Sequence, residues 1–256
     1  MVNKIKKIRV DELLVKRGLC DSRNMAKTLI LGAKVFSGTQ RIDKSSRTLP
    51  IEAPLSVKQP PKYVSRGGEK LEGFLKEFPF EIANKNALDV GASTGGFTDC
   101  LLQNGAAHVT CIDVGRAQIH NKIAQDKRIE NFEKLNARQL DDYSLPHTNY
   151  PIIVMDLSFI SLTKVFRPVW NRLSSGGTLV ALIKPQFEAS KKEVNESKGI
   201  IKDVQIQNRI LDEIKRFIES NLDQAFILGC KPSVIKGMDG NQEYLIGVNR
   251  NEPTRR

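Results

Sequence analysis

From Tyr63 onward, short apolar runs alternate with amphipathic stretches, and this alternation limits the possible folds more than any other feature. The apolar runs predict strands and the amphipathic stretches predict helices, a combination typical of an α/β protein with a doubly wound parallel sheet. The predicted strands are 87–90, 107–114, 129–135, 151–157, 178–184, 225–230 and 243–249. The predicted helices are 65–78, 96–105, 116–125, 162–174 and 204–220. The last two strands lack room for a crossover helix between them, so we expect them to form an antiparallel pair.

The first quarter of the chain differs from the rest in pattern and in charge. Residues 1–62 carry 14 Lys or Arg and 5 Asp or Glu, whereas the rest of the chain is close to neutral. Two short helices, at 10–18 and 23–32, precede short strands at 34–42 and 55–58, which together predict a small α/β module. A compact basic module attached to a near-neutral body indicates binding to a polyanion, with a merely solvated surface as the alternative.

Several basic side chains of this module can meet a phosphate backbone. Arg23 and Lys27 are four residues apart and share one helical face, and Lys34 follows that helix. The pattern R-x-D-x-L-L-V-x-R-G-L-x-x-S-R-x-x-A resembles the S4-type RNA-binding fold. The resemblance implies that residues of this module contact RNA, and the candidates are Arg9, Arg23, Lys27, Lys34 and Arg47. We add Arg66, which lies beyond the module.

Two consecutive prolines, Pro60 and Pro61, favour an extended connection between two domains. We predict an S4-like N-terminal domain at 1–59, a linker at 60–64 and a second domain at 65–256. The basic patch and the chemistry described next therefore belong to different domains.

Signals for targeting and for metal binding are missing from the sequence. The basic start has no apolar segment behind it, and no apolar run reaches the roughly 18 residues of a membrane span. The four cysteines contain no C-x-x-C pair, which disfavours a disulfide framework and structural zinc. We therefore expect a cytoplasmic protein that works without a membrane and without a metal.

A glycine-rich loop follows the first predicted strand of the second domain, with an acid at its mouth. It reads D-V-G-A-S-T-G-G-F-T over residues 89–98, which matches neither a phosphate-binding P-loop nor the dinucleotide pattern G-x-G-x-x-G. Asp89 disfavours a pyrophosphate but favours an ammonium group, and Asp113, near the end of the next strand, can accept hydrogen bonds from both hydroxyls of a ribose. S-adenosylmethionine has both groups. The alternative is that Gly95 and Gly96 only permit close packing of the strand and the helix.

This loop resembles motif I of the class I methyltransferases, which implies a Rossmann-like sheet that binds S-adenosylmethionine. Asn136, after the third strand, can hydrogen-bond the edge of the adenine, where such enzymes often have an acid. The cofactor contacts that the resemblance implies are Asp89, Gly91, Ser93, Gly95, Gly96, Phe97, Thr98, Asp113, Asn136 and Asp156.

The segment at the end of the fourth strand narrows the choice of methyl acceptor. Methyltransferases that act on amino groups usually have [DN]-P-P-[YF] there, whereas residues 156–159 read D-L-S-F. No cysteine lies near this loop to attack a pyrimidine. A hydroxyl acceptor needs a base, and a lysine can serve only when part of it is neutral, which burial and a neighbouring cation favour. Lys184, at the end of an apolar strand, is the candidate.

Four charged residues complete the pattern. Lys70, Asp156, Lys184 and Glu243 resemble the K-D-K-E tetrad of the FtsJ-like 2′-O-ribose methyltransferases. With the N-terminal module and the motifs S-R-G-G-x-K-L, D-L-S-F-I-S and K-P-Q-F-E, residues 8–249 resemble the TlyA family of rRNA 2′-O-methyltransferases. The resemblance implies methylation of the 2′-OH of a cytidine in ribosomal RNA or ribosomal subunits.

The resemblance also implies a role for each member of the tetrad. Lys184 is the expected general base, and Asp156 orients it together with the methyl group. Lys70 favours the neutral form of Lys184 by charge repulsion, and Glu243 positions Lys70 and the ribose. Methyl transfer from a sulfonium needs no metal.

Three alternative functions stay open. They are methylation of a base amino group, a membrane-active haemolysin, which is the label this family carries, and an RNA-binding protein without catalysis. Lys62-Tyr63-Val64 stands where the family has Arg-x-Trp-Val, so the coupling of the two domains depends on Tyr63. The charged, poorly patterned segment 188–202 is predicted to be a mobile loop, and we expect a monomer.

Overall fold

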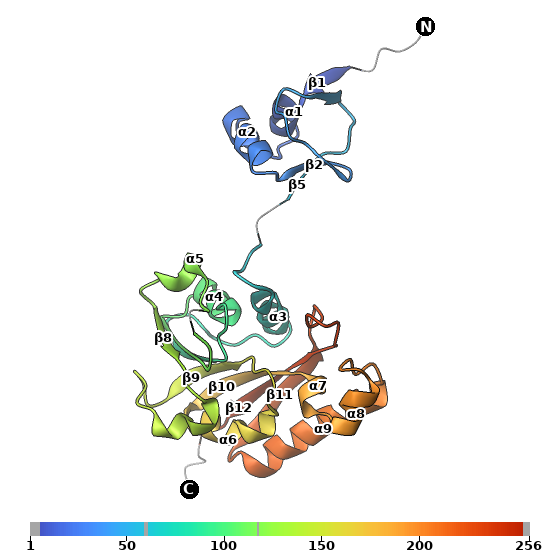
Figure 1. The fold of residues 1–256 in the computed structure, drawn as a ribbon. Coiled ribbons are helices and arrows are strands. Elements are labelled where there is room, and N and C mark those ends of the chain that lie inside the picture. Colours follow the sequence, from blue (N-terminus) through green and yellow to red (C-terminus); the bar gives the residue numbers. More distant parts are fainter. Residues whose placement is uncertain (1–5, 59–60, 117, 253–256) are drawn as a thin grey trace. The chain divides into compact units, whose positions relative to one another are not determined.

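The structure is a computed structural model, and it shows two compact units (Figure 1). It describes residues 6–58, 61–116 and 118–252. The smaller unit is Met1–Pro61 and the larger unit is Lys62–Arg256. The larger unit carries the predicted catalytic residues and the smaller one carries all the predicted RNA contacts except Arg66.

The last part of the predicted linker packs on the larger unit. Tyr63 is buried there, and the backbone N–H of Val64 donates to Asp99 Oδ2 at 2.8 Å. Gly68 lies directly against the Tyr63 ring, because a Cβ at this glycine would be 2.2 Å from the ring. Pro60 of the predicted linker lies outside the described residues.

The smaller unit packs two helices on short strands. Its elements are β1 (Lys7–Arg9), α1 (Val10–Lys16), α2 (Arg23–Leu31), β2 (Val35–Ser37), β3 (Gln40–Arg41), β4 (Thr48–Pro50) and β5 (Ser56–Val57). Helix α2 begins after Ser22, whose Oγ accepts a hydrogen bond from the backbone N–H of Met25 at 3.2 Å. The two predicted helices are confirmed. Strand β1 pairs with β4, and this pair was not predicted because three residues are too few to show a periodicity.

The larger unit contains a seven-stranded sheet. Its strands are β6 (Asn86–Val90), β7 (His108–Asp113), β8 (Ile129–Glu133), β9 (Tyr150–Met155), β10 (Leu173–Ile183), β11 (Ala225–Pro232) and β12 (Tyr244–Arg250). Their order in the sheet is β11-β12-β10-β9-β6-β7-β8. Strand β12 is antiparallel to both β10 and β11, and the other neighbours are parallel. The predicted parallel sheet with an antiparallel last pair is confirmed.

Helices cover both faces of this sheet, as Figure 1 shows. They are α3 (Arg66–Leu75), α4 (Gly96–Gln103), α5 (Asn121–Ala124), η1 (Ala137–Asp142), η2 (Leu162–Lys164), α6 (Phe166–Trp170), α7 (Pro185–Glu188), α8 (Lys191–Glu196) and α9 (Val204–Asn221). Side chains of one strand alternate between two cores: Leu88 packs with α6 and α9, whereas Ala87 packs with α3 and α4. The sheet is therefore doubly wound, with one core on each face.

Three predicted elements differ from the structure. Of the helix predicted at 116–125, only α5 forms, and Ala117 lies outside the described residues. The helix predicted at 162–174 is interrupted, because η2 and α6 are separate and Leu173 already begins β10. The loop predicted at 188–202 is wrong in its middle, where α8 forms. Ser190 and Glu193 make a capping box at the start of α8, which satisfies backbone N–H groups that a loop would leave to water.

Candidate active site

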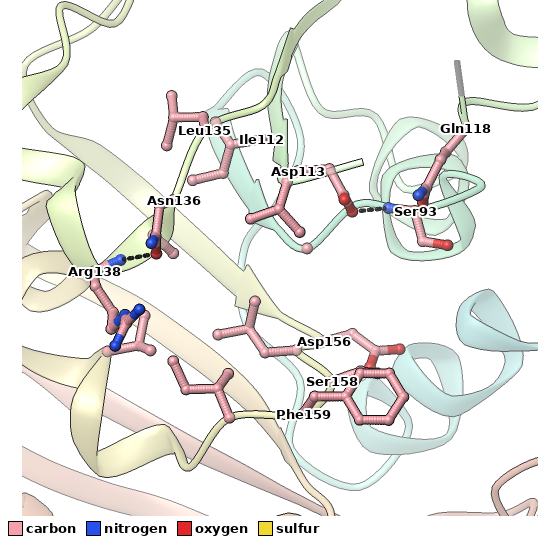
Figure 2. A pocket seen from close by; sticks show the side chains of 16 residues that line it. Ser93, Ile112, Asp113, Gln118, Leu135, Asn136, Arg138, Asp156, Ser158 and Phe159 are labelled. Carbon is pink, nitrogen blue, oxygen red and sulfur yellow. Dashed lines mark hydrogen bonds between the residues drawn. The ribbon is translucent and has the colours of Figure 1, made fainter. Parts of the chain in front are cut away.

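The carboxyl ends of the parallel strands form the edge where the site lies. The chain continues from β6 to β7 and β8 on one side and then returns to β9 on the other side of β6, so a crevice opens at this point of the edge. A cavity of about 410 Å³ lies there, lined by residues that follow β6, β7, β8 and β9 (Figure 2). A second cavity, of about 80 Å³, shares Gly91, Ser93 and Asp156 with the first.

The glycine loop between β6 and α4 needs its glycines for steric reasons. Gly91 has a φ of 84° and Gly95 a φ of 87°, a region that other residues rarely adopt. A Cβ at Gly91 would lie 2.5 Å from the carbonyl oxygen of Asp156, and a Cβ at Gly96 would lie 2.2 Å from Ser65 Oγ. The loop is thereby pressed against β9 on one side and against the start of α3 on the other. Close packing therefore explains why residue 96 is a glycine, as the alternative stated for the sequence expects. The same loop also lines both cavities, which close packing does not explain.

Asp113 and Asn136 lie along the larger cavity, where Figure 2 shows them. The carboxylate of Asp113 accepts hydrogen bonds from the backbone N–H groups of Ser93 at 2.8 Å and Gly115 at 2.7 Å. These bonds fix the carboxylate and leave each oxygen a second lone pair for a ligand. Asn136 Oδ1 accepts from the backbone N–H of Arg138 at 3.1 Å and leaves its amide N–H groups to the cavity. This arrangement suits a ribose at Asp113 and a flat nitrogen base at Asn136.

Asp89 lies beneath the glycine loop and borders the smaller cavity. Its side chain is fully buried, Thr98 Oγ1 donates to its Oδ2 at 2.6 Å, and its Oδ1 has no hydrogen-bond partner among the described residues. Burial raises the pKa of Asp89 to about 7, and the Thr98 hydrogen bond only partly opposes this. A buried carboxylate oxygen without a donor fits a cationic group that binds next to it. The two cavities together therefore fit a ligand with an ammonium group, a ribose and a base.

Lys184 and Asp156 form an ion pair at this edge. Lys184 Nζ lies 2.6 Å from Asp156 Oδ1 and donates a hydrogen bond to Ser158 Oγ at 2.9 Å. The side chains of Lys184 and Asp156 are 11% and 24% exposed. Asp156 lines both cavities, so the pair is open to a ligand.

Lys70 and Glu243 form a second ion pair. Lys70 lies on α3 and Glu243 directly precedes β12, and Lys70 Nζ is 2.5 Å from Glu243 Oε2. Their side chains are only 8% and 4% exposed. This pair links two segments that are 173 residues apart in the sequence.

The register of the sheet brings three of the four charged residues side by side. Met155 pairs with Ala181 in the parallel ladder of β9 and β10, and Asp156 follows directly. Ile183 pairs with Tyr244 in the antiparallel ladder of β10 and β12, so Lys184 and Glu243 are the next opposed residues. Lys70 reaches the same edge from α3 through its bond to Glu243. The structure thus gathers Lys70, Asp156, Lys184 and Glu243 at one place.

Two aromatic side chains beside Lys184 had no assigned role in the sequence. Phe159 is 90% exposed and has a φ of 63°, and its ring centroid is 5.0 Å from that of Phe187. Lys184 Nζ lies 5.9 Å from the centre of the Phe187 ring. The sequence shows an aromatic residue in the loop after Asp156, but its exposure is visible only in the structure.

The predicted RNA contacts of the smaller unit are not all free cations. Asp11 is fully buried, and Arg9 and Arg23 both donate hydrogen bonds to its carboxylate, which lowers the pKa of Asp11 to about 2. Arg47 donates to Gln40 Oε1 at 2.9 Å. The exposed or partly exposed lysines at 27 and 34 lie on and directly after α2, as predicted, and Arg66 of the larger unit is exposed at the start of α3.

The sequence pattern of the family described as FtsJ-like methyltransferase matches residues 63–250, which is most of the chain. The chain belongs to the FtsJ-like methyltransferase family. This confirms the predicted α/β methyltransferase fold and, with the relatives below, the resemblance to FtsJ-like and TlyA proteins.

Relatives of this FtsJ-like chain share most of its length. A Bacillus subtilis protein named "Putative rRNA methyltransferase YqxC" is 41% identical over 95% of this chain and 86% of its own. The "16S/23S rRNA (cytidine-2'-O)-methyltransferase TlyA" of Mycobacterium tuberculosis is 37% identical over 94% of this chain and 89% of its own. A solved structure described as "Putative hemolysin from Streptococcus thermophilus" has a TM-score of 0.70 at 34% identity, covering 98% of this chain and 91% of that one.

The hemolysin name of such relatives raises the question of membranes. Within the part of the FtsJ-like chain that the structure describes, no helix has both the length and the apolar character that a membrane crossing requires.

Proposed function

We propose that this protein transfers a methyl group from S-adenosylmethionine to the 2′-OH of a cytidine in ribosomal RNA. The observation that carries the proposal is the pair of Lys184 and Asp156, with an Nζ–Oδ1 distance of 2.6 Å, at the border of a cavity that fits the cofactor. The relatives named as rRNA and cytidine-2′-O methyltransferases support the choice of acceptor.

S-adenosylmethionine, when bound, would supply a methyl group on a sulfonium to a nucleophilic oxygen. Asp113 would hold its ribose, Asn136 would meet its base, and Asp89 would compensate its ammonium group. Gly91 lets the loop lie close to the end of β9, because a larger residue there would strike the carbonyl oxygen of Asp156.

Lys184 is the general base of the proposed reaction. A lysine can take the proton of the ribose hydroxyl only in its neutral form. The amine would take the hydroxyl proton as the oxygen bonds to the methyl carbon. The methyl–sulfur bond would break with its electron pair left on sulfur, so the proton ends on Nζ and the cofactor leaves as the neutral thioether. Asp156 and Ser158 hold Nζ in place and stabilise the ammonium that forms.

Lys70 and Glu243 have a different part in this proposal. Because Glu243 lies 2.5 Å from Lys70 Nζ, the two charges compensate each other and Lys70 exerts little net repulsion on Lys184. The pair therefore acts through position, because it holds α3 against the segment before β12 that carries Glu243. This differs from the charge-repulsion role that the family resemblance implies for Lys70.

RNA is proposed to contact both units. The smaller unit is proposed to be an S4-type RNA-binding domain that meets phosphates through Lys27, Lys34 and the arginines at Asp11. In the larger unit, the exposed ring of Phe159 supports stacking on the target base, a contact that adds about 1–3 kcal/mol.

The test is methyl transfer from labelled S-adenosylmethionine to ribosomal RNA that lacks the modification. The purified protein is incubated with ribosomal subunits and with free rRNA, and the product is digested to nucleosides and examined by mass spectrometry. We expect the label on the ribose of cytidine. A label on a base nitrogen would reject the 2′-O assignment, and no label on any rRNA would reject the proposed substrate.

A further inference from the structure

Glu188, the last residue of α7, is a partly buried carboxylate that the proposed reaction does not use. Its Oε2 accepts a hydrogen bond from Ser161 Oγ at 2.5 Å, and its Oε1 accepts one from the backbone N–H of Leu162 at 2.8 Å. Burial raises the pKa of Glu188, although both of these donors favour its charged form. A carboxylate kept in such a place at the cost of desolvation needs a reason.

Its two partners lie where the loop that follows β9 ends and η2 begins. This loop runs from Asp156 to Ser161 and then enters η2, and it carries Ser158 and Phe159. Ser161 is also the N-cap residue of η2, because its Oγ accepts from the backbone N–H of Thr163. Glu188 therefore holds the loop at the point where it becomes ordered helix again.

Helix α7 and this loop touch at three successive places. Lys184, at the N-terminal end of α7, contacts Asp156 and Ser158. Phe187 packs against Phe159, with the ring centroids 5.0 Å apart.

Glu188 makes the third contact, one helical turn beyond Lys184. Ser161 and Leu162, the partners of Glu188, are themselves absent from the lining of the larger cavity, although Ile160 before them and Val165 after them line it.

The backbone of the loop is strained between these places. Phe159 has a φ of 63°, which is unfavourable for a bulky residue and persists only when the surroundings hold it. Lys184 and Phe187 hold the loop before and at this residue, and Glu188 holds it after. Without Glu188 the loop can relax, and Asp156, Ser158 and Phe159 would then lose their fixed distance to Lys184.

We infer that Glu188 is a positioning residue, which fixes the loop 156–161 against α7 and so keeps Asp156 within contact of Lys184. This inference rests on the proposed function, because it concerns the same reaction. Glu188 acts through the loop rather than on the substrate, since both of its oxygens are already occupied by Ser161 and Leu162.

The experiment compares Glu188→Gln with Glu188→Ala. Glutamine keeps an oxygen that accepts from the Leu162 N–H, and its amide N–H can donate to Ser161 Oγ, so the loop stays attached. Alanine leaves both partners without an acceptor. A displacement of about 1 Å near reacting groups costs about 10²-fold in rate, so we expect that loss in kcat for E188A and a loss below about threefold for E188Q.

Two readouts separate positioning from a general loss of structure. The Kd for S-adenosylmethionine, measured by calorimetry, and the KM for rRNA should stay within about twofold of wild type in E188Q. Both should rise in E188A, because the loop carries Asp156, Ser158 and Phe159 of the larger cavity. The free energy of unfolding should stay close to the wild-type value in both variants. Fluorine NMR of protein labelled with fluorophenylalanine, with Phe159→Leu to assign the signal, should show a broadened or shifted resonance in E188A and an unchanged one in E188Q. Glu219→Ala, at an exposed position of α9, is the matched control and should behave as wild type.

Each outcome decides the inference. Turnover of E188A at the wild-type rate would overturn it. An equal loss in E188Q and E188A would also overturn it, because the negative charge rather than the attachment would then matter. Absence of methylation by the wild-type protein would reject the proposed function alone, and the difference between the two variants in the NMR spectrum would still test the attachment of the loop.

Discussion

The site contains two lysine–carboxylate pairs with nearly equal distances and unequal surroundings. Lys184 and Asp156 are 2.6 Å apart and border a cavity, whereas Lys70 and Glu243 are 2.5 Å apart and almost sealed. The open pair joins neighbouring strand ends, and the sealed pair joins helix α3 to the segment before β12. A lysine and a carboxylate thus take part in the proposed reaction where a ligand can reach them, and they stabilise the fold where it cannot.

The removal of one charged partner should destabilise the protein more in the sealed pair than in the open pair. Removal of one partner from a buried pair leaves an uncompensated charge and costs about 3–5 kcal/mol of stability. A pair that water can reach loses far less, because water solvates the remaining charge. We therefore expect substitutions in the open pair to lower mainly kcat, and substitutions in the sealed pair to lower both kcat and the free energy of unfolding.

The largest expected effect comes from the open pair. Lys184→Ala removes the proposed base, and general base catalysis contributes about 10²–10⁴-fold, so kcat for methyl transfer should fall by that factor. The Kd for S-adenosylmethionine should stay close to the wild-type value, because Lys184 is absent from the residues that line the two cavities.

A lysine outside the site is the control for the loss of one positive charge in Lys184→Ala. Lys127 is exposed and lies before β8, at the opposite edge of the sheet, so Lys127→Ala should methylate rRNA at the wild-type rate. Turnover of K184A at the wild-type rate would contradict the assignment of Lys184 as the base, and with it the difference in role between the two pairs.

The second effect concerns stability and comes from the sealed pair. Glu243→Ala leaves the Lys70 ammonium buried without its partner, so the free energy of unfolding should fall by about 3–5 kcal/mol in denaturant titrations. The double variant Lys70→Met with Glu243→Leu removes both charges and should recover most of that stability without recovering activity. Should E243A prove as stable as wild type, the pair is not sealed as the structure shows.

Asp156→Asn gives a smaller effect and separates charge from attachment in the open pair. Asparagine keeps an oxygen near Lys184 Nζ but no longer stabilises the ammonium that forms, so we expect kcat to fall about 10-fold to 10²-fold. The free energy of unfolding should fall by less than in E243A, because asparagine still offers Lys184 Nζ an oxygen and Ser158 Oγ remains as a second partner. A loss of stability as large as that of E243A would contradict the contrast between the pairs.

The sequence allowed the open pair to be predicted, because it depends only on strand ends. Asp156 and Lys184 each follow an apolar run, and parallel strands bring their carboxyl ends to one edge. The contact of Lys70 with Glu243 is different, because it depends on how α3 packs across 173 residues of chain. Only the family resemblance placed these two in the site, and neither residue shows a local pattern that would do so.

Other parts of the site escaped prediction for physical reasons. Charge counts treated Arg9 and Arg23 as free cations, but a count does not show which side chains face each other, and both are bound to the buried Asp11. The attachment of Glu188 to Ser161 joins two motifs that are separate in the sequence. Contacts of this kind depend on tertiary packing rather than on periodicity.

A third carboxylate extends the comparison, because no cation among the described residues pairs with it. Asp89 is as buried as Glu243, yet its Oδ1 has no donor among the described residues, and burial raises its pKa to about 7. Since this pKa lies above the usual 3.8 of the unfolded chain, the contribution of Asp89 to stability is present below about pH 4 and is lost as the pH rises through 7.

A bound ammonium group should supply the cation that Asp89 lacks. Binding to the ionised form then requires loss of a proton below pH 7, so the affinity for S-adenosylmethionine should fall by up to about tenfold for each pH unit below that value. Calorimetry in two buffers of different ionisation enthalpy should detect the released proton at pH 6 and much less of it at pH 8. Asp89→Asn should bind more weakly and without this pH dependence. An affinity in the wild-type protein that is constant from pH 5.5 to 8 would mean that Asp89 does not compensate the cofactor, and that its charge, like those of the sealed pair, belongs to the architecture of the site.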